Sequence, residues 1–385
     1  MHPIPPNLTA LVGNGLSIAY DRRLMLNQLC EALVCKLKLW GKDGEAVERT
    51  IRRIAVRVGT GDPRQDFEAL VGPFGTEAVT LLHLEELARY VDPSDAYVSA
   101  ALQEAARFAR RVGDVGTSHV LEEIIARSRA DCDRRAGLDA FMDTMVENFS
   151  GTITIANLNY DSLALASLSH LYDGLGVFCD QGCGYGKFDV TMPDGVEYTV
   201  RPLRTTLDFP NRVRLVHLHG SVTFWDRGNG ELLKLPIDAV RSPKLWQQVR
   251  ENPNFRPRPQ VVLASQADKS SLILREPFAL AYRELVRSLD RSDRWLIVGY
   301  SFRDACVNQQ LADAFARKTT PPEVMVVTYG HDPEYRTVID AFGWNEWGNG
   351  PADWLTINRA GVDAMVDSDD WKRFSGQPGT WKLAS

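Results

Sequence analysis

The feature that most constrains this chain is a repeated pairing of a short apolar run with the helical pattern that follows it. The first run is LTALVGNG at residues 8–15, which ends in two glycines and precedes leucines at helical spacing. Later runs are TITIANLNY, RVRLVHLHG, PQVVLA, WLIVGY and EVMVVTYG, and helical patterns such as DSLALASLSHLYD and FALAYRELVRSL lie between them. Strands that alternate with helices predict an α/β fold built on a parallel sheet.

One long stretch interrupts this alternation. Residues 46–150 are rich in Ala, Leu, Glu and Arg, with apolar residues three and four positions apart and no convincing strand. We therefore predict a helical insertion at 46–150, in which Asp66 and Glu68 lie at the start of one helix. Residues 1–45 and 151–330 together form the predicted discontinuous α/β domain.

Two later segments have their own character. Residues 174–211 predict loops and short hairpins, and SVTFWDRGNGELLKLP predicts a hairpin with its turn at residues 228–230. Residues 331–385 hold five of the nine tryptophans, and so much aromatic surface is costly to leave in water. We expect this segment to dock on the body or on a partner. Its tryptophans are Trp344, Trp347, Trp354, Trp371 and Trp381.

Composition narrows the class of protein. The chain has 385 residues, with 44 Lys plus Arg against 50 Asp plus Glu, so its formal charge is −6. It lacks an overall basic character, and we expect no direct nucleic-acid binding. No apolar run reaches the roughly 18 residues of a membrane span, and the start lacks the pattern of a signal peptide. The six cysteines form no C-x-x-C pair, so we expect reduced thiols in a cytoplasmic protein.

Two motifs follow the first two predicted strands. In VGNGLS, a glycine-rich turn leads from strand to helix, where free N–H groups attract phosphate; an ordinary tight turn is the alternative. The third glycine of the usual dinucleotide fingerprint is replaced by Ile18. In NLNYD, Asn159 offers a donor and an acceptor at a strand end, where no structural duty is obvious. Asp161 starts the next helix, so capping that helix is its alternative role.

The third motif is HLHG. His217 and His219 are two apart on a strand and face the same side. No further ligand pattern accompanies them, which argues against a metal site. His219 at the strand end suits a general base, whereas His217 lies deeper and suits the core.

A second phosphate-friendly turn occurs in VGYSFRDACVN, with Gly299 and Ser301 before a helix that Asp304 can cap. The pair Cys179 and Cys183 has C-x-x-x-C spacing and no second pair, so we expect free thiols rather than zinc ligands.

Taken in order, GNGLS, NYD, HG and GYS resemble the motifs of the sirtuin-type (SIR2-like) NAD-binding domain. The set looks closest to the bacterial SIR2-like proteins of antiphage defence. The resemblance covers about residues 8–330 and implies a Rossmann-like parallel sheet, with the helical block as an insertion.

The resemblance also implies roles for individual residues. Asn159 and His219 match the catalytic asparagine and histidine, and Asp161 matches the aspartate that holds the nicotinamide ribose. The family's loop that binds the NAD phosphates matches Gly13, Asn14, Gly15 and Ser17. Its contacts to the ADP half match Gly299 and Ser301, and its contacts to the adenosine match Thr328 and Tyr329.

Two departures separate this chain from protein-deacylating sirtuins. Those enzymes carry two cysteine pairs after the histidine, whereas only Cys306 follows His219 here. Their first motif is usually GAG, where this chain has GNG. Both departures suit the SIR2-like enzymes that hydrolyse NAD⁺ to nicotinamide and ADP-ribose. NAD is then a substrate and no metal is expected.

The resemblance further implies control, through a homo-oligomer or through an activating partner such as a hexameric ATPase, an argonaute-type protein or a phage protein. A protein deacylase and a non-catalytic sensor of NAD or ADP-ribose remain alternatives.

Overall fold

The computed structural model describes residues 6–40, 42–58, 67–91, 96–128, 132–228, 230–263 and 266–376. Its centre is a seven-stranded sheet in the order β12-β11-β10-β1-β2-β6-β3, and every neighbouring pair runs parallel. The strands are β1 (Leu8–Val12), β2 (Ile153–Asn157), β3 (Phe178–Asp180), β6 (Val213–His217), β10 (Arg294–Val298), β11 (Glu323–Val327) and β12 (Leu355–Asn358).

Without the edge strand β3, this order is that of a doubly wound Rossmann sheet, whose direction of winding reverses between β1 and β10. The Rossmann-like parallel sheet predicted from the sequence is therefore present. In such sheets a crevice opens beyond the carboxyl ends of the two strands that flank the reversal.

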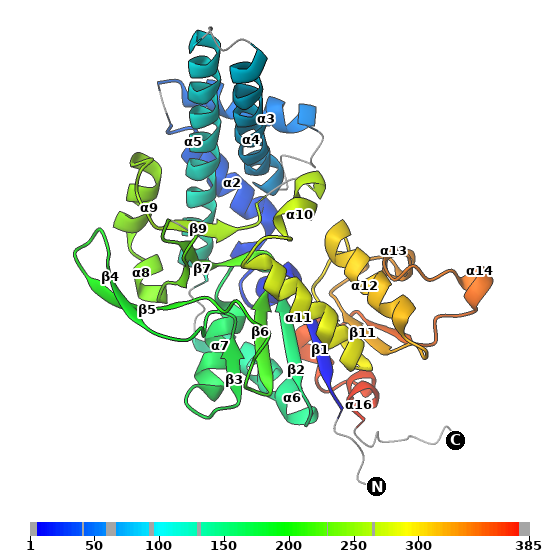
Figure 1. Cartoon of the computed structure of the whole chain (residues 1–385). Helices are drawn as coiled ribbons and strands as arrows, with labels where there is room; N and C mark the ends of the chain where they lie inside the picture. The colour runs from blue at the N-terminus through cyan, green and yellow to red at the C-terminus, as the bar shows by residue number, and fades with distance from the viewer. Residues whose placement is uncertain are drawn as a thin grey trace, which may run out of the picture.

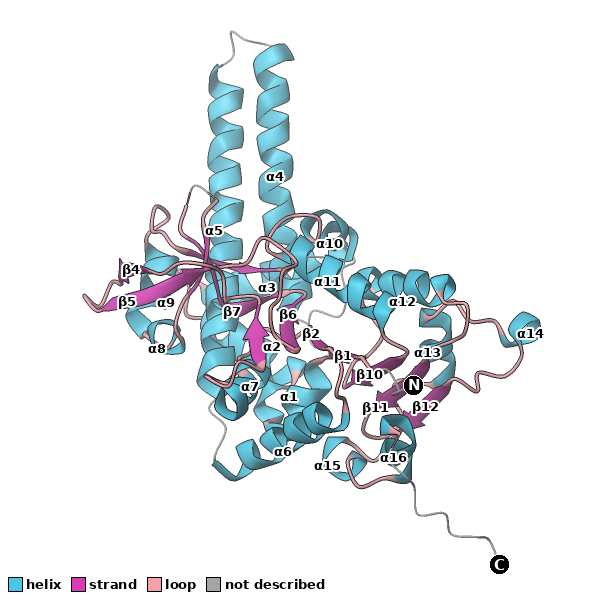
Figure 2. Ribbon diagram, turned by 60° about the horizontal axis from the view of Figure 1, so that its bottom comes forward, coloured by secondary structure: helices cyan, strands magenta, loops and turns pink. Residues whose placement is uncertain are grey.

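Both faces of the sheet are covered, as the continuous apolar runs require. Ala10 and Val12 of β1 pack into one core, and Leu11 between them packs into the other, because side chains alternate along a strand. Figure 2 shows α6 and α7 on one side of the sheet and α11 and α12 on the other. The helices that line the first core include α1 (Asn14–Tyr20), α2 (Leu26–Leu37), α6 (Cys132–Asn148), α7 (Leu163–Tyr172), α15 (Val362–Met365) and α16 (Asp369–Ser375). Those of the second core are α11 (Phe278–Arg291), α12 (Ala305–Arg317) and α13 (Tyr335–Ala341).

Between β1 and β2, every element after α2 is helical in the described residues. α3 (Gly44–Val58) leads to α4 (Phe67–Val91) and α5 (Ala96–Arg127), which lie side by side as a long hairpin that projects from the body (Figure 1). α6 does not join this hairpin but packs against α7 beside the sheet. Asp66 lies outside the described residues, and Glu68 lies in the first turn of α4.

A second, antiparallel sheet has the order β4-β5-β8-β7-β9. The expected hairpin is β7 and β8, which pair Trp225 with Leu233, while Asn229 at its turn lies outside the described residues. The segment PQVVLA, expected among the parallel strands, instead supplies β9, which pairs antiparallel with β7. The strands are β4 (Phe188–Thr191), β5 (Glu197–Pro202), β7 (Gly220–Asp226), β8 (Leu232–Lys234) and β9 (Arg258–Val261), and three helices follow β8 and β9: α8 (Ile237–Val240), α9 (Pro243–Glu251) and α10 (Gln266–Leu272).

The Trp-rich segment contributes β12 to the main sheet and also contains α14 (Glu346–Asn349). Trp354 packs on Phe315 and Phe342, with ring centroids 4.5 and 5.1 Å away. Trp371 is almost fully buried against Phe149. Trp381 and the side chain of Trp347 lie outside the described residues.

Within the described ranges, no helix combines the length and the apolar character that crossing a membrane requires.

Candidate functional site

Two glycine loops meet at the point where the winding of the sheet reverses. Gly15 follows β1 and Gly299 follows β10, and a Cβ atom on Gly15 would lie 2.5 Å from the Gly299 Cα. A Cβ on Gly13 would lie 2.7 Å from the Gly299 carbonyl oxygen. The Gly15 N–H donates to that same oxygen at 2.9 Å. These glycines are therefore needed for the close contact between two loops, which an isolated tight turn would not require.

The chain after Gly299 turns sharply. Phe302 has a φ of 57°, an unusual value for a bulky residue, and its ring is buried against Tyr300. Ser301 and Arg303, on either side of Phe302, are exposed and line the pockets described below. The strained residue thus lies inside the motif that the sequence singled out.

Asn159, Ser17 and Asp161 form one buried hydrogen-bond network. The Asn159 amide donates to the Gly13 carbonyl at 3.0 Å and to the Ser17 hydroxyl at 2.9 Å. Ser17 donates to Asp161 Oδ2 at 2.6 Å. Asn159 therefore has a structural duty that its sequence context did not reveal: it ties the end of β2 to the loop after β1. Both of its amide protons are used in this way, so its carbonyl oxygen is the atom available to a ligand.

Asp161 has two functions in this network. The N-cap of α7 is Ser162 rather than Asp161, but Asp161 Oδ1 accepts from the Leu163 N–H at 2.9 Å and so still satisfies a donor at the start of that helix. Its Oδ2 holds Ser17. Burial raises the pKa of Asp161, although the hydrogen bonds from Ser17 and the Leu163 backbone oppose that rise.

His219 is buried at the carboxyl end of β6, beside a carboxylate from another element. Its Nε2 lies 3.2 Å from Asp304 Oδ2, close enough for an ion pair but not aligned as a hydrogen bond. Asp304 Oδ1 meanwhile accepts from the backbone N–H groups of Cys306 and Val307 and so caps α12. One carboxylate therefore both starts a helix and faces the histidine.

A buried lysine links this pair to the helical hairpin. Lys269 of α10 is 3% exposed and lies 3.1 Å from Asp304 Oδ2 and 2.9 Å from Glu68 Oε2 on α4. Burial alone would raise the pKa of Asp304, but His219 and Lys269 hold it well below its usual range. Burial would likewise lower the pKa of Lys269, but Glu68 and Asp304 raise it above its ordinary value. Lys269 is therefore charged, and Asp304 is ionised next to His219.

Two pockets share the glycine loops as a common wall. The inner pocket, about 620 Å³, is lined by Asn159, Asp161 and His219 among others. The outer pocket, about 650 Å³, is lined by Thr328 and Tyr329 among others. Gly15, Ile18, Gly299, Tyr300, Ser301 and Arg303 line both. The site is thus a pair of adjoining cavities, each large enough for a drug-sized ligand.

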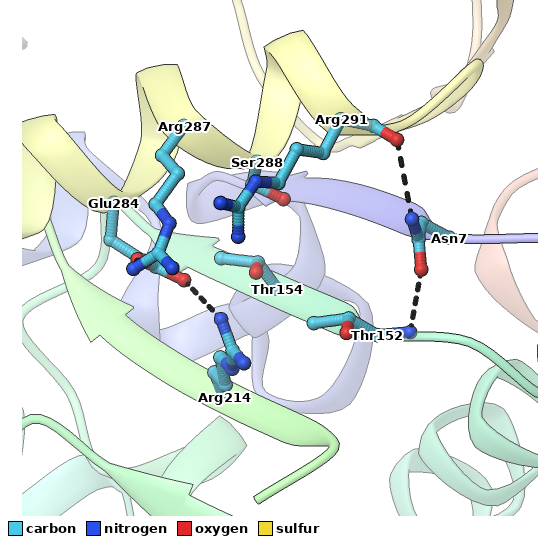
Figure 3. A pocket seen from close by; sticks show the side chains of 8 residues that line it. All are labelled: Asn7, Thr152, Thr154, Arg214, Glu284, Arg287, Ser288 and Arg291. Atoms are coloured by element: carbon cyan, nitrogen blue, oxygen red, sulfur yellow. Dashed lines mark hydrogen bonds and ion pairs between the residues drawn. The ribbon is translucent and has the colours of Figure 1, made fainter. Parts of the chain in front are cut away.

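A third cavity lies at the opposite, amino edge of the sheet, where Arg214, Glu284, Arg287 and Arg291 converge (Figure 3). Arg214 donates to Glu284 at 2.8 Å. This cavity has a volume of about 30 Å³, which suits a water molecule and excludes an organic substrate.

The structure brings together the residues that the sequence proposed for a site. The inner pocket holds Gly13, Asn14, Gly15, Asn159, Asp161, His219, Gly299 and Ser301, and the outer pocket holds Thr328 and Tyr329. Ser17 does not line either pocket but lies buried behind Asn159. His217 is fully buried against Phe224, and burial lowers its pKa to about 4, as suits a neutral core histidine.

Sequence reasoning did not assign several residues of the inner pocket to the site, among them Glu68, Tyr160, Lys269 and Arg303, and it gave Asp304 only the role of a cap. The Tyr160 hydroxyl contacts Glu68 and the Val262 carbonyl, and its ring lies 6.3 Å from that of His219. Arg303 forms no ion pair within the described residues. Glu68 and Lys269 stand in unremarkable helical stretches, so no local pattern distinguishes them.

Comparison with known families agrees with this geometry. The model of the SIR2-like domain matches residues 154–346, half of the chain, including β2, β6, β10 and β11 with the turns that follow them. No curated protein matches the chain. The motif order, the doubly wound sheet and the family match agree, and this chain belongs to the SIR2-like domain family.

Proposed function

We propose that this chain hydrolyses the bond between nicotinamide and ribose in NAD⁺. SIR2-like domains use NAD, and the observation that carries the proposal is the pair of adjoining pockets with His219 in the inner one. A dinucleotide has two nucleoside halves joined by a pyrophosphate. In the proposal, the nicotinamide half occupies the inner pocket, the adenosine half occupies the outer pocket beside Tyr329, and the pyrophosphate crosses the glycine loops.

Charge at the junction supports this orientation. Arg303 lines both pockets and has no ion pair within the described residues, so its guanidinium is free to meet the pyrophosphate. The N–H groups of Gly13, Gly15 and Gly299 already donate to carbonyl oxygens of the protein, so the pyrophosphate would meet other amides of these loops, such as that of Ser301, which lines both pockets.

The proposed chemistry needs little from the protein besides positioning and one base. Nicotinamide leaves as a neutral group when its bond to ribose C1′ breaks, and water adds to C1′. His219 accepts the proton from the water or from a ribose hydroxyl. The ionised Asp304 beside His219 stabilises the imidazolium that results. The Asn159 carbonyl oxygen orients the ribose or the water. The products are nicotinamide, ADP-ribose and a proton.

The test is nicotinamide release from NAD⁺ by the purified protein, with and without an acetylated peptide. Release without peptide supports hydrolysis. Release only with peptide would show a protein deacylase instead. Tight NAD⁺ binding without release under either condition would favour a sensor and contradict the proposal.

The proposal includes a biological setting that rests on the resemblance alone: NAD⁺ depletion in the bacterial cytoplasm during antiphage defence. An enzyme that depletes NAD⁺ needs control. We propose a homo-oligomer, with an activating partner such as a hexameric ATPase, an argonaute-type protein or a phage protein. Infection assays of a strain that carries the His219→Ala variant test this setting, which predicts lost protection.

A further inference from the structure

Another large pocket lies away from the candidate site and is distinct from the small cavity of Figure 3. It has a volume of about 700 Å³ and shares no lining residue with the inner or the outer pocket. Its floor is the loop CGYGK after β3, and its walls come from β5, β8 and α7. We name it the glycine-loop pocket after this CGYGK loop, which is distinct from the two loops at Gly15 and Gly299. It opens at the carboxyl end of a parallel strand, the edge at which α/β sheets bind ligands.

The lining of the glycine-loop pocket has an excess of positive charge. Its cations are Lys187, Arg201, Arg204 and Lys234, and its carboxylates are Asp173 and Asp180. Lys234 and Asp180 neutralise each other, with Nζ and Oδ2 2.5 Å apart. Arg204 pairs with Asp208, which lies outside the lining, so Lys187 and Arg201 remain beside the exposed carboxylate of Asp173. Lys187 and Arg201 form no ion pair within the described residues, so this excess is uncompensated by the protein.

Arg204 is the most informative of these cations. It is 7% exposed, and its guanidinium lies 5.5 Å from the Tyr185 ring and 5.3 Å from the Phe209 ring. Its Nε has no hydrogen-bond partner, and its closest carboxylate, on Asp208, is 3.4 Å from Nη1. Burying a guanidinium with so few partners is costly unless an anion completes its hydrogen bonds.

The loop packs closely against the end of β5, because a Cβ on Gly184 would lie 2.3 Å from the Pro202 carbonyl oxygen. Gly186 has a φ of +87° and open space around its Cα. The backbone N–H groups of Tyr185, Gly186 and Lys187 are not bonded to other described residues, so three successive donors are available. Successive free amides form a concavity that binds phosphate. The Tyr185 ring is 75% exposed at the same place and offers a flat surface to a second ring.

We propose that the glycine-loop pocket binds a nucleoside phosphate. The cations and the loop amides would hold the phosphates, and Tyr185 would stack on the base. This site is separate from the proposed NAD⁺ site and does not depend on the proposed reaction.

Isothermal titration with ATP in metal-free buffer tests the proposal. The Lys187→Glu/Arg201→Glu variant should lose one binding event or weaken it about tenfold or more, since hydrogen bonds to charged groups contribute that much. Two controls separate this result from other causes. The Arg107→Glu/Arg111→Glu variant makes the same change of net charge on exposed positions of α5, and Arg303→Glu changes the NAD⁺ site. Neither should affect this event.

A second titrant tests the nucleoside part. Inorganic tripolyphosphate carries the phosphates of ATP without its ring, and it should bind the unaltered protein about fivefold or more weakly than ATP. Tyr185→Ala should remove that difference. Equal binding of ATP and tripolyphosphate would overturn the nucleoside assignment. Absence of any ATP binding event, or an event that Arg303→Glu removes and Lys187→Glu/Arg201→Glu does not, would overturn the site.

Discussion

At the scale of single residues, the proposed reaction depends on one carboxylate that contacts two elements. Asp304 caps α12 through Oδ1 and faces His219 and Lys269 through Oδ2. Asp304→Asn keeps an oxygen for the cap but removes the charge that stabilises a protonated His219. We predict that nicotinamide release falls about a hundredfold while the protein stays folded. Asp290→Asn, at an exposed ion pair with Arg317, is the matched control and should leave the rate unchanged. An unchanged rate in Asp304→Asn would show that the carboxylate only caps the helix.

Two histidines, the half-buried His119 and the buried His217, predict how stability depends on pH. Burial, helped by Arg250 and Lys36, lowers the pKa of His119 to about 4, and burial lowers that of His217 to about 4. The same side chains in the unfolded chain titrate near pH 6.5. The unfolded state therefore binds more protons between pH 6.5 and 4, and stability present above pH 6.5 is lost as pH falls. Urea midpoints measured across this range should fall, and His119→Gln should reduce the fall. Equal slopes for both proteins would contradict this.

The sequence predicted the residues of the site better than their partners. Each predicted residue followed a strand, and the parallel sheet brings the strand ends together. Glu68 and Lys269 could not be predicted in the same way, because they come from helices whose position depends on long-range packing. Asn159 shows the converse limit: its role in holding Gly13 is visible only once β1 and β2 are paired.

At the scale of elements, the contact between the loops after β1 and β10 decides whether the site forms. Gly15→Ala would place a methyl group 2.5 Å from the Gly299 Cα, and neither backbone can move without separating the two strand ends. We predict a loss of about 1–3 kcal/mol of stability together with most of the activity. Gly75→Ala is the matched control, since Gly75 is exposed in α4 with open space around its Cα, and it should be neutral or slightly stabilising. Chemical denaturation of both variants measures the difference. Equal stability would mean that the loops tolerate separation.

The elements also show where sequence patterns reach their limit. Five of the seven parallel strands, β1, β2, β6, β10 and β11, were predictable because each is a largely buried, continuous apolar run. The partner of β9 was not, because PQVVLA resembles those runs and only its pairing with β7 places it in the second sheet. Two parallel strands were missed: β3, which lies in the segment predicted as loops and hairpins, and β12. Both are short, FCD and LTIN, and lie at the two edges of the sheet.

At the scale of the whole molecule, the α4–α5 hairpin stands away from the body (Figure 1). It carries exposed apolar side chains. Leu87, Tyr90 and Tyr97 are 56%, 78% and 82% exposed. We propose that a second copy of the chain covers this surface, as apolar area of this kind marks interaction sites. Leu87→Glu/Tyr90→Glu should shift the oligomer to monomer in light scattering, whereas Thr319→Glu/Thr320→Glu, which adds the same charge at exposed positions after α12, should not. A monomeric unaltered protein, or an oligomer that survives the first variant, would contradict the assignment.

The hairpin is also connected to the candidate site. Glu68 in the first turn of α4 holds Lys269, which holds Asp304 beside His219. A short chain of ion pairs therefore joins the base of the hairpin to the proposed catalytic histidine, and we propose it as the route by which assembly controls activity.

The most direct measurement of the central claim compares three proteins: the unaltered chain, His219→Ala and His170→Ala. His170 is a histidine on α7 whose side chain is 58% exposed, and it lies outside both pockets. Nicotinamide release should fall about a hundredfold to ten-thousandfold in His219→Ala and stay unchanged in His170→Ala. Calorimetry should show that His219→Ala still binds NAD⁺. Undiminished release by a folded His219→Ala protein would contradict the claim that His219 in the inner pocket cleaves NAD⁺.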